Sequence, residues 1–541
     1  MASTMSSLFI SITGLQAAQS GLANVSHNIS NTETEGYTRQ QVIQSFSKQT
    51  NEGNQGCGPG LLQIGLGVDV NTIRQIRNRY YDVSYRNQNS VTNYYSTKYT
   101  TGVEMESIVG ELESDYKLQS VLEDMWDAMN ELTIHPEGIE TRAEFLETCI
   151  TFLNKVKDIH TNLYNYQMKL NDKVYGTVED INDMVAKVAE YNELIYAAEV
   201  NGNTANDYRD QRNLLIDKLS GLADITVKES ILGNGYKDLL INGQELLVNN
   251  YQQKIGLRYT SGDYPFVEPV FSSNEDVLPV SNTTARRVYR DLTKEDLSAE
   301  SDATVGTLKA LLVSRGEVIG NYAMSDEEIN NYLIPEFQKK LDTMVHSVVT
   351  LINDNLAPIE GEQPYDLYGN HGENEEVFVR RNFDNGYGRY DGKEEDPDDF
   401  ASLYTIDNLE INPVYLQSSG YNYLAFSPSG DIGDTSLLNK LTQLWKTGME
   451  ELGNVSADTY YKNMITEVGI EVNEAKLLYE TENNMLDVVQ NTRLSMSGVS
   501  LDEELSTMLK YQHAYNAAAK MINIIDSMID KVVNGTGRVG L

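Results

Sequence analysis

The residue types that most often carry enzyme chemistry are scattered along this chain. The six histidines stand at positions 27, 135, 160, 346, 371 and 513, so none has a second histidine at the spacing that places two metal ligands on one helix face. The phosphate-binding loop, the H-E-x-x-H zinc motif, the G-x-S-x-G nucleophile elbow and the EF-hand loop are absent from the sequence. We therefore expect no catalytic residue, no resident metal and no cofactor, and the chain is predicted not to be an enzyme.

The densest group of carboxylates lies in residues 361–400, where twelve acidic residues accompany four basic ones, including the run KEEDPDD from Lys393 to Asp399. Clustered oxygens can hold calcium. The spacing does not match a calcium loop, so a solvated acidic loop is the favoured interpretation. Gly65 and Gly67 lack the third glycine of a dinucleotide site and indicate a bend between strands. Cys57 and Cys149 form no C-x-x-C pair and are interpreted as isolated thiols.

Net charge restricts the partners of the chain. Lys and Arg number 42 and Asp and Glu number 80, which gives a net charge of −38, and such a surface is unsuited to nucleic acid or to an anionic membrane. A small basic cluster at Arg74, Arg77, Arg79 and Arg86 is expected to pair with neighbouring acids. Residues 1–45 carry two acids and one base, and residues 501–541 carry five acids and four bases. We expect these near-neutral ends to be buried against partners.

The first thirty residues show a heptad pattern. Leu8, Leu15, Leu22 and Ile29 recur every seven residues, and Ile12 occupies the other position of the seam. This spacing predicts an amphipathic, coiled-coil-like helix of about 25 residues. The segment has no basic residue before its apolar positions, so it is not interpreted as a cleaved secretory signal.

The last forty residues repeat the arrangement. One apolar row contains Leu501, Met508, Tyr515, Ile522 and Ile529, and a second row contains Tyr511, Ala518, Ile525 and Val532. A helix with two apolar rows is wide enough to pack against more than one neighbour, and Asn534-Gly535 predicts its end. The residues expected to form an assembly interface are Leu8, Ile12, Leu15, Leu22, Ile29, Leu501, Leu505, Met508, Tyr515, Ile522 and Ile529.

The middle of the chain alternates between sequence patterns typical of helices and patterns typical of strands. Long helices are predicted over 88–200, for example at 118–129 and 174–200, with Pro136 between them. Strands and Asn-Gly or Ser-Gly turns are predicted over 222–290, and helices return at 305–323 and 332–353. The fold class is therefore predicted to be mainly α with β-rich inserts, with paired N- and C-terminal coiled-coil-like helices and a nested helical body. The predicted segments are 1–60 (terminal helix and linker), 61–356 (helical body with a β-rich insert near 222–300), 357–434 (variable β-rich insert), 435–494 (return helices of the body) and 495–541 (C-terminal helix).

The segment LANVSHNISNTETEGYTRQ, residues 22–40, resembles the signature that follows the first helix in the flagellar axial family of rod, hook and hook-associated proteins. The matching residues are Asn28, Asn31, Gly36, Tyr37, Arg39 and Gln40, together with Ile29 and Thr34. Departures from the family pattern are His27, Ser30 and Glu35. The pair Arg39-Gln40, the stretch around Asp210 and Arg212, and the C-terminal run from Ser500 are similar to the hook-associated members rather than to hook or rod subunits.

This resemblance implies a structural subunit at the junction between hook and filament, which assembles through its terminal helices and serves motility. It further implies type III export from the cytoplasm to the extracellular flagellum. The implied partners are copies of the same chain in a ring, the hook protein, a second junction protein on the filament side, and a cytoplasmic chaperone at the C-terminal helix. Two alternatives stay open: another axial subunit (hook, rod or filament), and a glycan-binding adhesin role of the Tyr-rich loops around Tyr387 and Tyr390. A calcium-dependent enzyme is the weakest alternative.

Overall fold

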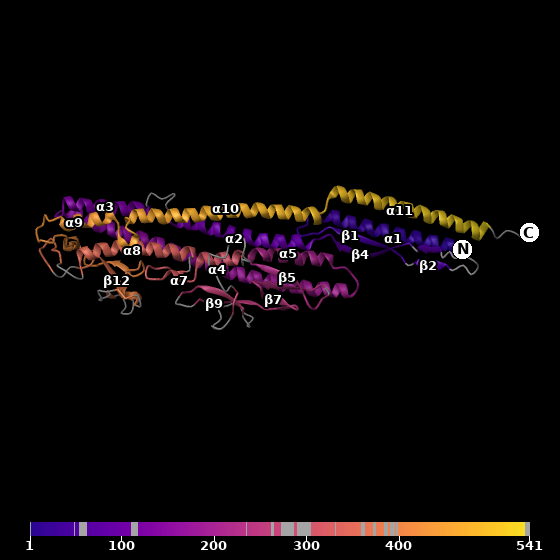
Figure 1. The fold of residues 1–541 in the computed structure, drawn as a ribbon, viewed down its shortest axis with the longest axis horizontal. Helices are drawn as coiled ribbons and strands as arrows, with labels where there is room; N and C mark the ends of the chain where they lie inside the picture. Colours follow the sequence, from indigo (N-terminus) through magenta and orange to yellow (C-terminus); the bar gives the residue numbers. More distant parts are fainter. Residues whose placement is uncertain are drawn as a thin grey trace, which may run out of the picture. The chain divides into compact units, whose positions relative to one another are not determined.

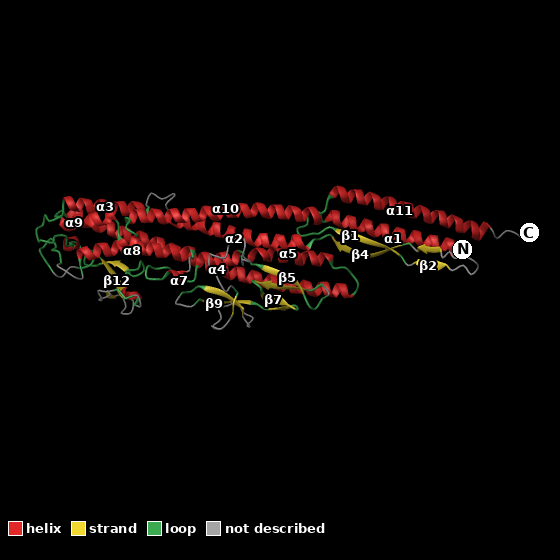
Figure 2. Ribbon diagram, viewed as in Figure 1, coloured by secondary structure: helices red, strands yellow, loops and turns green. Residues whose placement is uncertain are grey.

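The computed structural model describes residues 2–47, 49–52, 62–65, 67–109, 117–233, 235–260, 264–271, 286–288, 305–329, 332–358, 363–371, 375–382, 388–389, 395–396 and 399–535. The chain divides into two compact units. The first unit contains residues 1–90, 181–253 and 482–541, and the second contains residues 91–180 and 254–481. Helices predominate in both units, and the strands form small separate sheets (Figure 2).

The first unit brings the two ends of the chain together. Helix α1 (Ala2–Ser30) lies along α11 (Leu501–Asp530), and the N- and C-terminal labels stand at the same end of this pair in Figure 1. A π-helical turn, Lys531–Gly535, closes α11 near the predicted end. The other elements of this unit are α5 (Asn206–Leu222), the pairs β1 (Gln40–Phe46) with β4 (Val68–Gln75) and β2 (Gln49–Glu52) with β3 (Leu62–Gly65), and the sheet β5 (Ile225–Glu229), β6 (Lys237–Ile241), β7 (Gln244–Val248) and β8 (Tyr251–Gln252).

The sheet of the first unit is antiparallel throughout. Strand β6 pairs with β7 through a turn in which Asn242 has φ of 48° and Gly243 has φ of 68°. These two positive φ values suit the twist of a two-residue hairpin and explain why Asn-Gly stands there. This Asn-Gly turn was predicted from the sequence, whereas the predicted Ser-Gly turn at 261–262 lies outside the described residues.

Three long helices contribute residues to each unit: α2 (Arg79–Val109), α4 (Ile139–Val200) and α10 (Ala457–Ser497). Buried side chains of α4 recur at three- and four-residue spacing, for example at Phe145, Cys149, Phe152 and Val156. That spacing places them on one face of a helix. The pattern explains why α4 is one continuous helix rather than the shorter helix predicted from residue 174.

The second unit is a helical body with short strands. Its helices are α3 (Leu118–Ile134), α6 (Thr307–Arg315), α7 (Asp326–Ile329), α8 (Leu333–Leu356) and α9 (Ser436–Thr447). Its two sheets contain β9 (Ile255–Tyr259), β10 (Val267–Phe271) and β11 (Arg286–Arg287), and β12 (Phe378–Asn382), β13 (Gly388–Arg389) and β14 (Leu409–Ile411). In the described part of 357–434, the remaining regular structure consists of two 3-10 turns, Phe400–Ser402 and Gly420–Tyr423.

The predicted fold class is confirmed: the protein is mainly α with small β-rich inserts and paired terminal helices. The break at Pro136 is also confirmed, because α3 ends at Ile134 and α4 begins at Ile139. The helix predicted over 305–323 is wrong beyond Arg315. Gly316 ends α6 with φ of 75°, and a Cβ there would lie 2.4 Å from Pro335. Residues 40–46 and 49–52, expected as part of a linker, form β1 and β2. The five-segment domain division stays a prediction.

None of the helices in the described ranges combines the length and apolar character needed to cross a membrane.

Candidate assembly interface

The contact between α1 and α11 depends on a small residue. A Cβ added at Gly21 of α1 would lie 2.6 Å from the ring of Tyr511 on α11, which is closer than two non-bonded carbon atoms can approach. Ala17 and Val25, one helical turn to either side of Gly21, are also buried. Small side chains let two helices approach closely, so an aromatic ring of α11 packs directly on the backbone of α1.

The predicted heptad row of α1 is not the buried seam of the first unit. Leu8, Leu15, Leu22 and Ile29 are only half-buried, and Ile12 is 38% exposed. The fully buried positions of α1 lie on a different face of the helix: Thr13, Ala17, Ala18, Gly21, Asn24, Val25 and Asn28. The leucine row therefore keeps apolar surface available after the chain has folded.

The two predicted apolar rows of α11 also differ in how deeply they are buried. Of the α11 residues expected at the interface, Leu501 is 48% and Leu505 is 49% exposed. Tyr515 is also exposed, while Met508, Ile522 and Ile529 are half-buried. The most buried positions are Glu504 and Ile525, which share the second row with Tyr511. The second row therefore faces α1, and the row assigned to assembly is turned more toward solvent.

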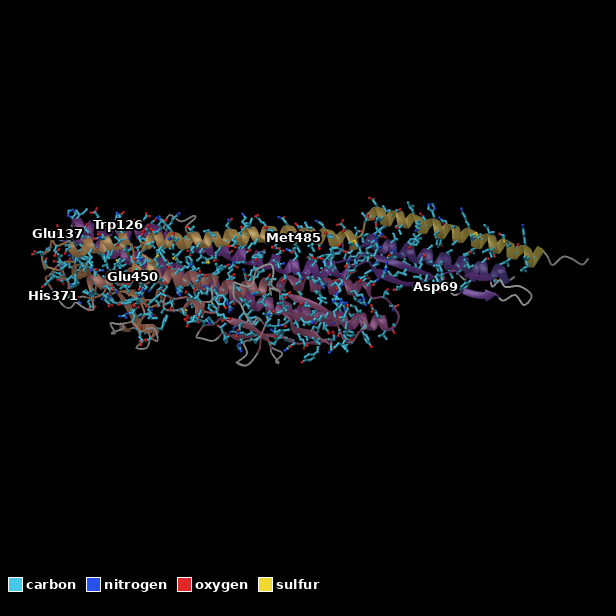
Figure 3. The ribbon with its side chains drawn as sticks, in the orientation of Figure 1. Asp69, Trp126, Glu137, His371, Glu450 and Met485 are labelled. Atoms are coloured by element: carbon cyan, nitrogen blue, oxygen red, sulfur yellow. The ribbon has the colours of Figure 1, made fainter. Side chains whose placement is uncertain are left out.

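Further apolar side chains extend this exposed surface. Met5, Phe9 and Ile10 of α1, and Leu509, Met521, Ile524, Met528, Val532 and Val533 at the C-terminal end, are exposed. Met485, labelled in Figure 3, and Val488, Leu494 and Met496 continue it along the part of α10 that belongs to the first unit. Isolated exposed apolar residues are ordinary, whereas larger exposed apolar patches are typical of protein-binding surfaces.

The family motif forms the exit from α1. The Asn31 side chain donates to the carbonyl of His27 at 3.0 Å and accepts from the Thr34 hydroxyl at 3.2 Å. Gly36 follows with φ of 79°, and a Cβ there would lie 3.1 Å from Leu214 of α5. A left-handed backbone and close packing both favour glycine at this position. These contacts explain the Asn31 and Gly36 of the motif, and the exit turn forms with Glu35 in place.

Asn28 is the centre of a hydrogen-bond network that joins the two ends of the chain. Its buried amide donates to the carbonyl of Gln40 at 2.9 Å and to Glu504 Oε2 at 3.1 Å. Its amide oxygen accepts from the Gln40 backbone N–H at 3.0 Å and from the Tyr37 hydroxyl at 2.8 Å. Asn24 donates to the same Gln40 carbonyl at 2.8 Å. One asparagine thereby fixes β1, the Tyr37 side chain and α11 relative to α1.

Arg39 makes the second connection to α11. Its Nε donates to Glu504 Oε1 and its Nη1 to Glu503 Oε2, both at 2.7 Å. Its backbone N–H donates to the carbonyl of Ser497, at the end of α10, at 2.9 Å. Glu504 is only 2% exposed, and a buried carboxylate requires such partners. The Arg39 of the family motif therefore neutralises a charge on the other end of the chain.

Gln40 and Tyr37 connect the motif to α5. Gln40 donates through Nε2 to Asp207 Oδ1 at 3.0 Å and accepts from Asn206 Nδ2 at 3.1 Å. Burial, together with the charges of Asp207, Asp210 and Glu504, raises the pKa of Tyr37. Its hydroxyl therefore stays protonated and serves as the donor to Asn28.

Asp210 of α5 receives two donors from the N-terminal segment. The Thr38 backbone N–H lies 3.1 Å from its Oδ2, and Gln75 Nε2 lies 2.7 Å from its Oδ1. Burial raises the pKa of Asp210 to about 6, although the hydrogen bonds from Thr38 and the charge of Arg77 act to lower it. The acidic residue of the α5 motif is thus a buried structural acceptor.

A buried ion network fastens the end of α10. Arg493 lies 3.0 Å from Asp82 Oδ1 and 2.6 Å from Asp217 Oδ2. Arg77 pairs with Asp82 at 2.6 Å, and Arg86 pairs with Asp217 at 2.7 Å. The prediction that the basic cluster pairs with acids is confirmed for Arg77 and Arg86. The role of Arg493 was missed, since its partners are more than 270 positions away in sequence.

The histidines and the cysteine that could carry chemistry in the described part of the chain lie in structural contacts. No set of three or more His, Cys, Asp and Glu side chains there could hold a metal ion. His346 lies between Glu451 at 2.8 Å and Glu395 at 3.0 Å, and His160 lies 3.2 Å from Asp407. Cys149 is buried in α4. Tyr387, Tyr390, Cys57 and most of the acidic run 393–399 lie outside the described residues.

Known proteins are similar to this chain over nearly its whole length. The model of the flagellar hook-associated protein FlgK helical domain matches residues 103–374, and that of the flagellar basal body rod FlgEFG protein C-terminal matches residues 490–535. Flagellar hook-associated protein 1 of Bacillus subtilis is 28% identical, over 99% of this chain and 99% of its own. The Escherichia coli protein of that name is 22% identical over 97% and 98%. The solved flagellar hook junction protein FlgK from Burkholderia pseudomallei has a similar fold, with a TM-score of 0.56 and 12% identity, over 77% of this chain and all of its own.

Proposed function

The chain belongs to the flagellar hook-associated protein FlgK family, and we propose that it assembles into the flagellar axis through the outward faces of α1 and α11. Like the other members of this family, it is a structural subunit of the hook–filament junction and not an enzyme. It therefore belongs to the flagellum and assembles with other axial components. What needs explanation is which surface of this chain makes the contacts.

The exposed apolar surface of the paired helices carries the proposal. The intramolecular contact uses Gly21 and the Glu504–Tyr511 row, and it leaves the leucine row of α1 and the row from Leu501 to Ile529 partly uncovered. Burying a large apolar side chain is worth about 1.5–3 kcal/mol. A set of such residues supplies a strong driving force for association, and the near-neutral ends lower the electrostatic cost of packing copies together.

The match at residues 490–535 supports the same surface. This range covers α11 and is described by a model of rod-protein C-termini. A segment shared between hook-associated and rod subunits fits a contact that axial proteins have in common. We infer that the terminal pair packs against neighbouring copies of this chain in a ring, and against the hook protein on one side and a second junction protein on the filament side.

The same exposed surface suits an export chaperone. Before assembly, the apolar residues of α11 would face the cytoplasm, where uncovered apolar helices tend to aggregate. A cytoplasmic partner that covers α11 until type III export would prevent this. The final location is then the extracellular flagellum.

Complementation of motility tests the proposal. In a flagellated host lacking its own copy, the wild-type chain should restore filament attachment. Leu509→Lys, at an exposed apolar position of α11, should leave filaments shed into the medium. The matched control is Ile231→Lys, because Ile231 is 93% exposed in the turn between β5 and β6. If Leu509→Lys and Ile231→Lys both restore attached filaments, the outward face of α11 is not the interface.

A further inference from the structure

A cavity of about 220 Å³ lies in the first unit, and half of the residues that line it are basic. Its walls come from the residues before α2, from the first turns of α2, from α5, and from β5 and β6. The charged residues that line it are Arg77, Arg79, Arg86, Arg209, Arg212 and Lys237, with Asp82 and Glu229. Six cations beside two anions is an unusual local balance in a chain whose net charge is −38.

Several of these cations already have carboxylate partners. Arg209 binds both oxygens of Glu199 at 2.8 Å, and Lys237 pairs with Glu229. Arg77 and Arg86 belong to the ion network described above. Two cations remain. Arg79 is exposed and makes no ion pair with any residue that the structure describes. Arg212 donates only to neutral oxygens.

Arg212 is a buried charge with incomplete partners. It is 1% exposed, and its Nη1 donates to Asn192 Oδ1 at 2.7 Å and to the Gly235 carbonyl at 2.6 Å. Its Nε has no acceptor. Burial, followed by the charge of Arg209, lowers the pKa of Arg212 to about 9. The guanidinium is therefore still charged at neutral pH, and a counter-anion would stabilise it.

Arg77, which also lines the cavity, has the same feature. Its Nε is paired with Asp82, but its Nη2 is buried without an acceptor. A buried donor without an acceptor destabilises the fold, and more so when it is charged. Two residues that line the same cavity thus each hold a guanidinium N–H in need of an acceptor.

We propose that this cavity binds a small tetrahedral oxyanion of the phosphate class, held by Arg77, Arg79 and Arg212. Guanidinium groups present planar pairs of N–H donors that match the oxygens of such an anion. The acidic lining residues do not oppose it strongly, since Asp82 and Glu229 are already neutralised by Arg77, Arg493 and Lys237. The bound anion would draw α2 and α5 together within the first unit.

Calorimetric titration of the full chain with inorganic phosphate at constant ionic strength tests this site. We expect saturable binding to one site per chain. Arg79→Gln should weaken it about tenfold, the effect of losing one charge-assisted contact. Arg79 is exposed and unpaired, so this variant keeps the fold. The matched control is Arg74→Gln, since Arg74 is exposed and its described hydrogen bond is to Gln41 rather than to the cavity.

Three results would overturn the proposal. The first is the absence of saturable phosphate binding. The second is an equal loss of affinity in Arg74→Gln and Arg79→Gln, which would indicate general surface electrostatics. The third is acetate binding as tightly as phosphate, which would show that the cavity selects charge alone. Because the site lies away from the outward faces of α1 and α11, its failure would leave the assembly proposal unaffected.

Discussion

Replacing Asn28 by aspartate tests the network that joins the two ends of the chain. The substitution preserves the shape of the side chain but converts the amide donor, 3.1 Å from Glu504 Oε2, into a carboxylate oxygen. Glu504 is buried, so two like charges would face each other with little water between them. At this distance and an effective dielectric constant of about 20, their repulsion is about 5 kcal/mol.

Protonation limits that penalty. Protonating the introduced aspartate at pH 7 would cost about 4 kcal/mol from the reference pKa of an aspartate, so we expect the pairing of α1 with α11 to lose about 4 kcal/mol. The folded state would bind the extra proton more tightly than the unfolded state. The loss should therefore shrink as the pH falls, and near pH 4 only the cost of the lost hydrogen bonds, about 1–2 kcal/mol, should remain.

Hydrogen exchange of peptides from residues 20–32 and 501–511 measures this local free energy of opening. The matched control is Asn516→Asp, since Asn516 is exposed on α11, the helix that contains Glu504, and its replacement should change the opening free energy by less than about 0.5 kcal/mol. Unchanged protection in Asn28→Asp, or a loss independent of pH, would refute the role given to Asn28.

Three further perturbations follow from the packing and the charges. Gly21→Leu should weaken the pairing of α1 with α11 by about 1–3 kcal/mol, because the leucine would overlap the Tyr511 ring. Adding Tyr511→Ala should recover most of this lost free energy. If the losses of the two single variants simply add in the double variant, the two residues are not in direct contact. Burial acts to lower the pKa of His346, but hydrogen bonds to its two glutamates outweigh burial and raise the pKa to about 9, so its stabilisation is complete below about pH 6.5 and is lost as the pH rises through 9. Because one of the glutamates is half exposed, the free energy of unfolding should fall by about 1–2 kcal/mol over that pH range. Thermal unfolding monitored by tryptophan fluorescence measures this change, because Trp126 (Figure 3) and the second tryptophan lie in the same unit as His346. A His346→Gln chain with the same pH profile would exclude this assignment. Arg493→Met should cost about 3 kcal/mol by leaving its two aspartates with one cation each, and urea unfolding within about 1 kcal/mol of wild type would argue against the ion network.

Periodicity was sufficient to predict the terminal helices and their pairing. The heptads at both ends predicted helices close to those observed, and Asn534-Gly535 marked the end of the second. Turn chemistry was equally direct at Asn242-Gly243 and at Gly36, where positive φ values require the residues present. These features are local, so the sequence alone contains the information that determines them.

The choice of which helix face packs inside the chain was not predictable from hydrophobicity. The leucine row is the more apolar face of α1, yet the buried face contains Ala17, Gly21 and Asn28. Close approach to Tyr511 and satisfaction of the Gln40 backbone outweigh apolar area there. Small residues at four-residue spacing were the sequence signal that could have indicated this face.

The buried polar partners were beyond the reach of sequence reasoning. Glu504 meets Asn28 across 476 positions, and Arg493 meets Asp217 across 276. Such pairs depend on three-dimensional proximity, which neither periodicity nor composition encodes. The helix predicted past Arg315 failed for a related reason, since Gly316 packs against Pro335 of another helix.

The central claim is that the outward face of α11 is covered in the assembled flagellum. Its most direct test is maleimide labelling of Leu509→Cys in secreted monomer and in purified flagella, with Ile231→Cys as the control at an exposed position outside the terminal pair. The wild-type chain provides the background for its own cysteines, of which Cys149 is buried. We expect Leu509→Cys to be labelled in the monomer and protected after assembly, while Ile231→Cys is labelled in both. Equal labelling of Leu509→Cys in monomer and flagella would contradict assembly through this face.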